Sequence, residues 1–307
     1  MNASPTGNQY SIRRVSDLGD WSATITERAA GIRLLTLDGI DLVEPFPEDR
    51  VPPYAAGIVL MPWANRIRDG KWTLNGATQQ LDITEPAAHN AIHGLLRNAH
   101  YTLGDRGADW VRLEAPVFPQ HGYPFHLETS VTYRLLANGL QVTHDVRNVG
   151  PTTAPVALGA HPFVKIGDVP TTDLTLTVDA ATRFEVDDRF NVLAEVGVEG
   201  TQYDLRDGVR LGDVSLDDGY GSVSHTEGET RHSITAPDGR RVTVWGDSNI
   251  RYVQVFTTDD FSTETVGDVA VAIEPMTAPA GSLATGEGLT WLEPGEEWAV
   301  RWGIRYS

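Results

Sequence analysis

Residues 126–148 have the sequence HLETSVTYRLLANGLQVTHDVRN, and its spacing decides the class of fold. In the first half, apolar or β-branched side chains occupy every second position, at Leu127, Thr129, Val131, Tyr133 and Leu135. The second half alternates in the same way from Leu140 to Val146. A period of two places such side chains on one face of a strand, and Asn138-Gly139 between the halves is typical of a tight hairpin. The stretch therefore predicts two antiparallel strands with one buried face.

The same alternation recurs along the chain, in DLTLTVDA (173–180), RRVTVWGD (240–247), RYVQVFTT (251–258) and EEWAVRWGIRY (296–306). Further hairpin turns are predicted at Asp38-Gly39, Asn75-Gly76 and Asp238-Gly239. No segment has the pattern of a long amphipathic helix. We therefore predict an all-β fold, a large antiparallel β-sandwich. Because no low-complexity linker or fixed repeat divides the chain, we expect one domain over 11–307, preceded by a polar, flexible tail over 1–10.

Composition narrows the classes of partner. The 42 acidic and 24 basic residues give a net charge of −18, which repels phosphate backbones and argues against nucleic acid as a partner. No apolar run is long enough to span a membrane, and the polar N-terminus does not resemble a secretory signal. The absence of cysteine excludes disulfides and thiolate chemistry. We expect a cytoplasmic protein, a monomer or homodimer, that acts on a small molecule.

Five short segments carry polar residues that interrupt the apolar strand pattern. They are MPWANRIRDGKW with Asn65 and Arg66, HNAIHGLLR with His93, LGAHPFV with His161, SLDDGYG with Asp217, and VAIEPMTAPAGS with Glu274. Each one alone is typical of a structural residue, such as a surface ion pair, a core histidine or an acid at a turn. His89 and His93 are four residues apart, as metal ligands on a helix can be, but Gly94 follows directly and no third ligand is near. We predict no metal site.

Taken together, these motifs resemble the aldose 1-epimerase (galactose mutarotase) family, in particular a bacterial branch of it. The segments PWANRIRDGKW, NAIHGLLR, GAHPFV, LDDGY and IEPMTAPAGS occur in the order and approximate spacing of that family, from about residue 30 to residue 304. The resemblance implies a β-supersandwich with an open, sugar-sized cleft on a concave sheet. It implies neither a metal nor an organic cofactor.

The resemblance also implies roles for individual residues. Glu274 matches the general base of the family and His161 its general acid. Arg66 and His93 match residues that hold the sugar and polarise it near the ring oxygen, and Asp217 matches an aspartate that binds sugar hydroxyls. We expect His161 to be protonated, because a carboxylate lies near it and the chain is acidic, and Glu274 to be ionised beside Arg66.

Asn65 and Gln254 match secondary positions of the site. Trp63 and Phe163 lie beside the proposed residues, where they either stack on the sugar or belong to the core. The implied reaction exchanges the α and β anomers of a free monosaccharide, for example glucose or galactose. Ala278 leaves the preferred sugar open, because relatives often have cysteine there.

Further positions differ from the family pattern, and other substrates and functions are still open. Ala280 and Asp218-Gly219 also differ from many relatives. Arg68 and Arg97 are basic residues that either hold the anionic group of a hexose 6-phosphate or of sulfoquinovose, or lie on the surface. Glycoside hydrolysis by Glu274 with a second carboxylate, Asp217, is a weaker alternative. A non-catalytic sugar-binding module of the same fold is another.

Overall fold

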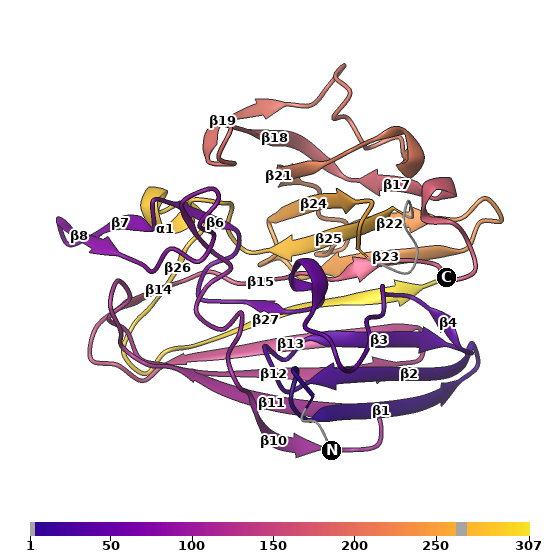
Figure 1. Ribbon diagram of the computed structural model, residues 1–307, viewed down its shortest axis with the longest axis horizontal. Helices are drawn as coiled ribbons and strands as arrows, with labels where there is room; N and C mark the ends of the chain where they lie inside the picture. The colour runs from indigo at the N-terminus through magenta and orange to yellow at the C-terminus, as the bar shows by residue number, and fades with distance from the viewer. Residues whose placement is uncertain (1–3, 262–268) are drawn as a thin grey trace.

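Antiparallel strands form almost all the regular structure in the computed structural model, which describes residues 4–261 and 269–307 (Figure 1). The described helical segments are α1 (Ser282–Thr285) and the short 3-10 turns η1 (Pro53–Ala55), η2 (Thr171–Asp173) and η3 (Leu211–Asp213). The all-β prediction is therefore confirmed. Within the described part of the chain, no helix has the length and apolar character needed to cross a membrane.

The larger sheet has nine strands and is built outward from the predicted hairpin. Its spatial order is β10 (Thr102–Arg106), β11 (Trp110–Val117), β12 (Leu127–Leu136), β13 (Gly139–Asn148), β27 (Glu297–Tyr306), β23 (Arg241–Gly246), β22 (Thr230–Thr235), β17 (Thr175–Val178) and β20 (Val209–Arg210). In the hairpin, Leu136 pairs with Gly139. The side chains of Leu127, Val131 and Tyr133 are buried, as the alternation predicts.

The second large sheet has eight strands and carries most of the predicted site residues. Its spatial order is β19 (Val192–Gly197), β18 (Ala180–Val186), β21 (Asp217–Val223), β24 (Tyr252–Thr258), β25 (Ala270–Met276), β15 (Gly159–Ala160) and β5 (Val59–Leu60), and β16 (Phe163–Val164) also pairs with β25. Buried side chains of both large sheets, such as Val142 and Ile304 from one and Val253 and Ile273 from the other, belong to one apolar cluster. The two sheets therefore form the predicted antiparallel sandwich.

Four smaller sheets complete the fold. They are the sheet of β1 (Gln9–Ser16), β2 (Gly19–Thr26), β3 (Ile32–Leu37) and β4 (Ile40–Asp41), and the pairs β14 (Ala154–Val156) with β26 (Thr290–Leu292), β6 (Arg66–Arg68) with β9 (Asn90–Ile92), and β7 (Lys71–Leu74) with β8 (Ala77–Gln80). The four-stranded sheet lies beside β11 and β12, and β6 and β7 lie near α1 (Figure 1).

The predicted N-terminal tail is too long. Strand β1 begins at Gln9, and the side chain of Thr6 is fully buried. Gln9 donates a hydrogen bond from Nε2 to the Thr6 hydroxyl, at 2.8 Å. Residues 4–10 are therefore held against the fold by hydrogen bonds that the polar composition of this segment does not reveal. Residues 1–3, the rest of the predicted tail, lie outside the described residues.

All four predicted hairpins form, with differences in turn length. Asp38-Gly39 and Asn75-Gly76 are two-residue turns with positive φ at both positions, which is the type I′ geometry that such pairs favour. The turn before β13 is formed by residues 137–138, so Gly139 already belongs to the strand. The turn around Asp238-Gly239 is longer, because Thr235 pairs with Arg241.

Candidate active site

Glu274, Gln254 and Asp217 lie on three adjacent strands of the eight-stranded sheet. In the register of the sheet, Gln254 of β24 faces Glu274 of β25, and Phe256 of β24 faces Asp217 of β21. Positions two apart on a strand share a face, so these four side chains project from the same side of the sheet. Gln254 Nε2 donates a hydrogen bond of 2.7 Å to Asp217 Oδ1. The antiparallel pairing thus collects residues that are far apart in the sequence.

Asn65, Arg66 and His93 come from the small sheet of β6 and β9. Arg66 pairs with Ile92, the last residue of β9, and the backbone N–H of His93 donates to the Asn65 carbonyl at 3.0 Å. Asn65 and His93 both have left-handed backbone conformations, with φ of 55° and 64°. Such conformations are uncommon for residues other than glycine and gather at functional sites. They turn both chain segments at the cavity that Asn65 and His93 line.

His161 lies beside Glu274 because of strand pairing. It connects β15 and β16, and both of these short strands pair with β25. His161 Nε2 is 3.3 Å from Glu274 Oε1, and the two side chains are only 6% and 2% exposed. The His93 ring meets the His161 ring edge-on at a centroid distance of 5.4 Å. The predicted acid and base therefore form a buried pair, with His93 next to it.

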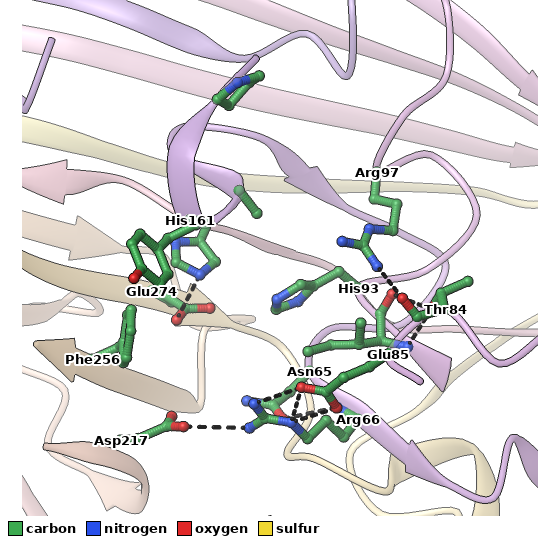
Figure 2. A pocket seen from close by; sticks show the side chains of 14 residues that line it. Asn65, Arg66, Thr84, Glu85, His93, Arg97, His161, Asp217, Phe256 and Glu274 are labelled. Atoms are coloured by element: carbon green, nitrogen blue, oxygen red, sulfur yellow. Dashed lines mark hydrogen bonds and ion pairs between the residues drawn. The ribbon is translucent and has the colours of Figure 1, made fainter. Parts of the chain in front are cut away.

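A cavity of about 410 Å³ lies against this pair, within the range of roughly 300–1,000 Å³ that is usual for small-molecule sites. It is lined by Pro52, Tyr54, Ala55, Asn65, Arg66, Thr84, Glu85, Ile92, His93, Arg97, His161, Asp217, Phe256 and Glu274. Figure 2 shows Glu274, His161 and Phe256 on one side, and Arg66, Glu85 and Arg97 on the other. Six of the seven predicted site residues line the cavity. The seventh, Gln254, reaches it through its hydrogen bond to Asp217.

Burial favours the neutral form of both members of the pair. It raises the pKa of Glu274 well above its ordinary value, an effect that Asp217 increases and Arg66 opposes. Burial, assisted by the positive charges of Arg66 and Arg97, lowers the pKa of His161 to about 4. The expected protonated His161 and ionised Glu274 are therefore disfavoured in this pocket. Removal from water outweighs the negative charge of the chain. The pocket therefore favours the neutral pair, in which Glu274 can donate a proton and His161 Nε2 can accept one.

Several polar atoms of the site are buried without a hydrogen-bond partner among the described residues. They include Glu274 Oε2 and the Nδ1 atoms of His93 and His161. Buried polar groups in proteins are normally hydrogen-bonded. Burial also lowers the pKa of His93, so its ring is neutral and can both donate and accept. Three incompletely bonded groups at one cavity indicate a site for a polar ligand.

Arg66 is held by an acid that the sequence analysis did not select. Its Nε donates to both carboxylate oxygens of Glu85, at 2.9 and 3.1 Å, and its Nη2 donates to Oε1 at 3.0 Å. Its Nη1 is 3.5 Å from Asp217 Oδ2. Glu85 lies in the loop between β8 and β9 and belongs to none of the sequence motifs. Only its contact with Arg66 identifies it as a residue of the site.

For Trp63, Phe163 and Arg68, the structure favours the structural alternative that the sequence left open. Trp63 and Phe163 are each 1% exposed and do not line the cavity, so they belong to the core, although the Phe163 ring stacks on His161. Arg68 is half exposed and pairs with Asp187, which is its surface role.

His89 and His93, the two histidines with metal-ligand spacing, have different surroundings. The side chain of His89 is 65% exposed and contacts Asp69, whereas His93 is buried at the cavity. Across residues 4–261 and 269–307, no three His, Cys, Asp or Glu side chains are arranged to hold a metal ion. His89 and His93 flank strand β9 and do not lie on a helix.

Comparison with known proteins agrees with this architecture. The family model described as aldose 1-epimerase matches residues 18–305. The chain is 30% identical to the uncharacterized protein YihR of Escherichia coli K12. The alignment spans 279 residues, which are 91% of this chain and 88% of YihR.

Two solved structures show the same fold. One is a GalM/aldose epimerase homologue from C. elegans, with a TM-score of 0.84, 19% identity and coverage of 98% of this chain and 99% of that one. The other is a putative aldose 1-epimerase from Escherichia coli K12, with a TM-score of 0.82, 18% identity and coverage of 98% and 99%.

Proposed function

We propose that this chain, which belongs to the aldose 1-epimerase family, is a mutarotase that interconverts the α and β anomers of a free aldohexose such as glucose or galactose. One observation carries the proposal. A buried carboxyl and a buried imidazole, Glu274 and His161, lie 3.3 Å apart at a cavity of small-molecule size. The resemblance suggests the sugar, and the pair supplies the chemistry.

The reaction needs one proton acceptor and one proton donor close together. Ring opening removes the proton of the C1 hydroxyl and adds a proton to the ring oxygen, and both oxygens are bonded to C1. The C1–C2 bond then rotates, and the ring closes on the other face of the aldehyde with both transfers reversed. Because the reacting oxygens share a carbon, two groups 3.3 Å apart can serve both. General acid–base catalysis of this kind contributes about 10²–10⁴-fold.

Glu274 and His161 share one proton that either can carry, which suits a reversible reaction. In the neutral form, Glu274 is a donor and His161 an acceptor; moving one proton gives the ion pair with the roles exchanged. Both forms have the same net charge, so each can be reached without a change in the charge of the pocket. We assign the base in ring opening to Glu274 and the acid to His161, which requires the ion-pair form. Negative charge developing on the sugar oxygens would be stabilised by Arg66.

The remaining residues are assigned to sugar binding. Asp217 accepts hydrogen bonds from sugar hydroxyls, and Gln254 orients its carboxylate. His93 hydrogen-bonds near the ring oxygen, and Asn65 supports Arg66 by accepting the Arg66 backbone N–H at 2.8 Å. We propose that the protein needs no cofactor and acts in the cytoplasm as a monomer or homodimer, without nucleic-acid or membrane partners.

A second candidate substrate is an anionic sugar, such as a hexose 6-phosphate or sulfoquinovose, and Arg97 favours it. Arg97 lines the cavity, and its Nε is buried without a partner among the described residues. Its Nη1 donates a long hydrogen bond of 3.4 Å to the Thr84 carbonyl. Arg97 and Arg28 both line an adjoining cavity of about 200 Å³. Among the described residues, neither forms an ion pair with a carboxylate. In a chain of net charge −18, two such cations beside a sugar-sized cavity suit an anionic substituent.

The test follows optical rotation after crystalline α-D-glucose or α-D-galactose is dissolved, with wild type, Glu274→Gln or no protein. We expect acceleration by wild type and a loss of about 10²–10⁴-fold in the variant. Glucose 6-phosphate and sulfoquinovose form the second panel, followed by NMR exchange between anomers. Arg97→Gln should reduce turnover of an anionic sugar about tenfold or more and affect glucose little, and Arg68→Gln is the matched surface control.

The outcomes separate the candidates. Turnover of a sugar by wild type with full activity retained in Glu274→Gln would refute the assigned base. Binding of a sugar without acceleration of any anomer exchange would favour the carbohydrate-binding module. Release of a sugar from a glycoside, followed by a reducing-sugar assay, would favour the hydrolase. That alternative is weakened by geometry, since the close partner of Glu274 is His161 and that of Asp217 is Arg66.

A further inference from the structure

Arg66 has one close carboxylate partner and one distant one. Glu85 accepts three hydrogen bonds of 2.9 to 3.1 Å from its guanidinium, through both carboxylate oxygens. Asp217 lies at 3.5 Å and also accepts a shorter bond from Gln254. The guanidinium carbon is 4.4 Å from the centre of the Phe190 ring. The plane of the guanidinium is therefore set by Glu85 and Phe190, and Asp217 contributes less.

Glu85 is itself fixed by its backbone. Its N–H donates to the Asn90 carbonyl at 3.0 Å, and the Asn90 N–H donates back to the Glu85 carbonyl at 3.2 Å. Asn90 is fully buried and donates from Nδ2 to the Arg189 carbonyl at 2.9 Å. The loop thus presents the Glu85 carboxylate to Arg66 from a rigid base. A carboxylate fixed in this way can hold the Arg66 side chain in one orientation.

The hydrogen bonds to Glu85 leave one edge of the Arg66 guanidinium, the Nη1 edge, available at the cavity. A guanidinium has five N–H groups in a rigid plane. The bonds from Nε and Nη2 occupy the edge that faces Glu85, so Nη1 is turned towards Asp217. The charges around the guanidinium are Glu85, Asp217 and Glu274. Without Glu85, the same side chain is free to turn towards either of the other two acids.

We propose that Glu85 is a positioning residue of the active site, which holds the Arg66 guanidinium with its Nη1 edge towards the substrate and balances part of its charge. The inference rests on the proposed function, since it assigns Glu85 to the same reaction. Glu85 is not a catalytic residue in this scheme: it transfers no proton, and its effect on the sugar passes through Arg66. If Arg66 stabilises charge that develops during ring opening, loss of its orientation lowers kcat more than it raises KM.

The test compares Glu85→Gln with Glu229→Gln. Glu229 accepts hydrogen bonds of 2.6 and 2.8 Å from Arg305, and the two carboxylates have similar exposure, so this variant loses an arginine–carboxylate pair away from the cavity. We expect Glu85→Gln to lower kcat about 10- to 100-fold, the range of a lost charge-assisted hydrogen bond. We expect KM to change less than threefold and Glu229→Gln to retain wild-type kinetics.

A second measurement does not depend on catalysis. In ¹H–¹⁵N spectra, the Arg66 Nε–H signal, assigned by its loss in Arg66→Lys, should exchange slowly with water in wild type and rapidly in Glu85→Gln. Glu85→Asp, which keeps the charge but shortens the reach, should lie between them in kcat and in exchange. It also serves as the test variant if Glu85→Gln does not fold.

Unchanged kcat in Glu85→Gln, or unchanged protection of Arg66 Nε–H, would overturn the inference. An equal loss of activity in Glu229→Gln would do so as well, because the effect would then belong to ion pairs in general. If wild type accelerates none of the sugars, the proposed function fails first. The exchange measurement then decides whether Glu85 holds Arg66 at all.

Discussion

Glu274→Gln should make the protein more stable while it removes the activity. The carboxyl is 2% exposed, and Oε2 has no hydrogen-bond partner among the described residues. The folded protein keeps this carboxyl protonated at pH values where it would ionise in water, which costs about 1.4 kcal/mol per pH unit above the unfolded pKa. The amide has nearly the same shape, cannot ionise, and can donate to His161 Nε2. We therefore expect the free energy of unfolding to rise by about 1–3 kcal/mol, and kcat to fall about 10²–10⁴-fold.

The gain should depend on pH in a defined direction. Burial raises the pKa of Glu274 above that of an unfolded glutamate, which is about 4.3. Above that pH the unfolded chain has lost a proton that the folded protein retains. The folded state binds more protons, so this carboxyl makes the protein less stable as pH rises towards its folded pKa, by up to about 1.4 kcal/mol per pH unit. Glu274→Gln lacks the effect, and its advantage should be larger at pH 8 than at pH 5.

Urea unfolding at pH 5, 6.5 and 8 measures this difference. Glu114→Gln, at a half-exposed carboxylate paired with Arg112, is a control that should not change it. The reasoning is refuted if Glu274→Gln is less stable than wild type at pH 8. That result would show that the folded protein holds an ionised Glu274, stabilised by Arg66 and a protonated His161. The same samples give kcat, so stability and activity are compared on one preparation.

Three further outcomes are expected. The pKa values of buried His144 and His232 are lowered to about 3 and about 4, against about 6.5 when unfolded, so the unfolded chain binds more protons below pH 6.5. Each should therefore cost about 2 kcal/mol of stability between pH 6.5 and 4.5. Urea unfolding should show this fall, and His232→Gln should lose the contribution of one of the two histidines. Gly94→Ala should destabilise by about 3 kcal/mol or more, because φ is +73° and the new Cβ would lie 2.1 Å from the Met61 carbonyl oxygen; a thermal melt equal to wild type would contradict this. Phe256→Ala should raise KM for the sugar roughly 2- to 10-fold with kcat nearly unchanged, since it removes an apolar wall of the cavity; steady-state kinetics measure it, and an unchanged KM would show that the ring does not contact the sugar.

Much of the strand structure was predictable because its signals are local. Alternation over ten residues and a two-residue turn select a hairpin whatever surrounds them. The signal is weaker where hydrogen bonds come from other segments. Thr6 lies in a polar stretch that resembles a tail, and only its contacts with Gln9 and neighbouring segments show that it is held.

The residues of the site were predictable from the sequence, but their protonation states were not. The motifs place Glu274 and His161 at the ends of apolar runs, and strand pairing then brings them to 3.3 Å. Their protonation depends on how much water the whole fold removes from them, which no motif records. The expectation for His161 was therefore wrong, because it counted neighbouring and net charges and omitted desolvation.

By itself the sequence determined the strand class, four hairpins and the identity of the groups available for proton transfer. The tertiary structure decided which of those groups meet. Arg66 and Arg68 are two residues apart on the same short strand. Arg66 is partly buried and pairs with Glu85 at the cavity, whereas Arg68 pairs with Asp187 at the surface. Local patterns act over a few residues, whereas partners and burial are set by sheet register and packing between distant segments. The geometry of the site therefore exists only in the folded chain.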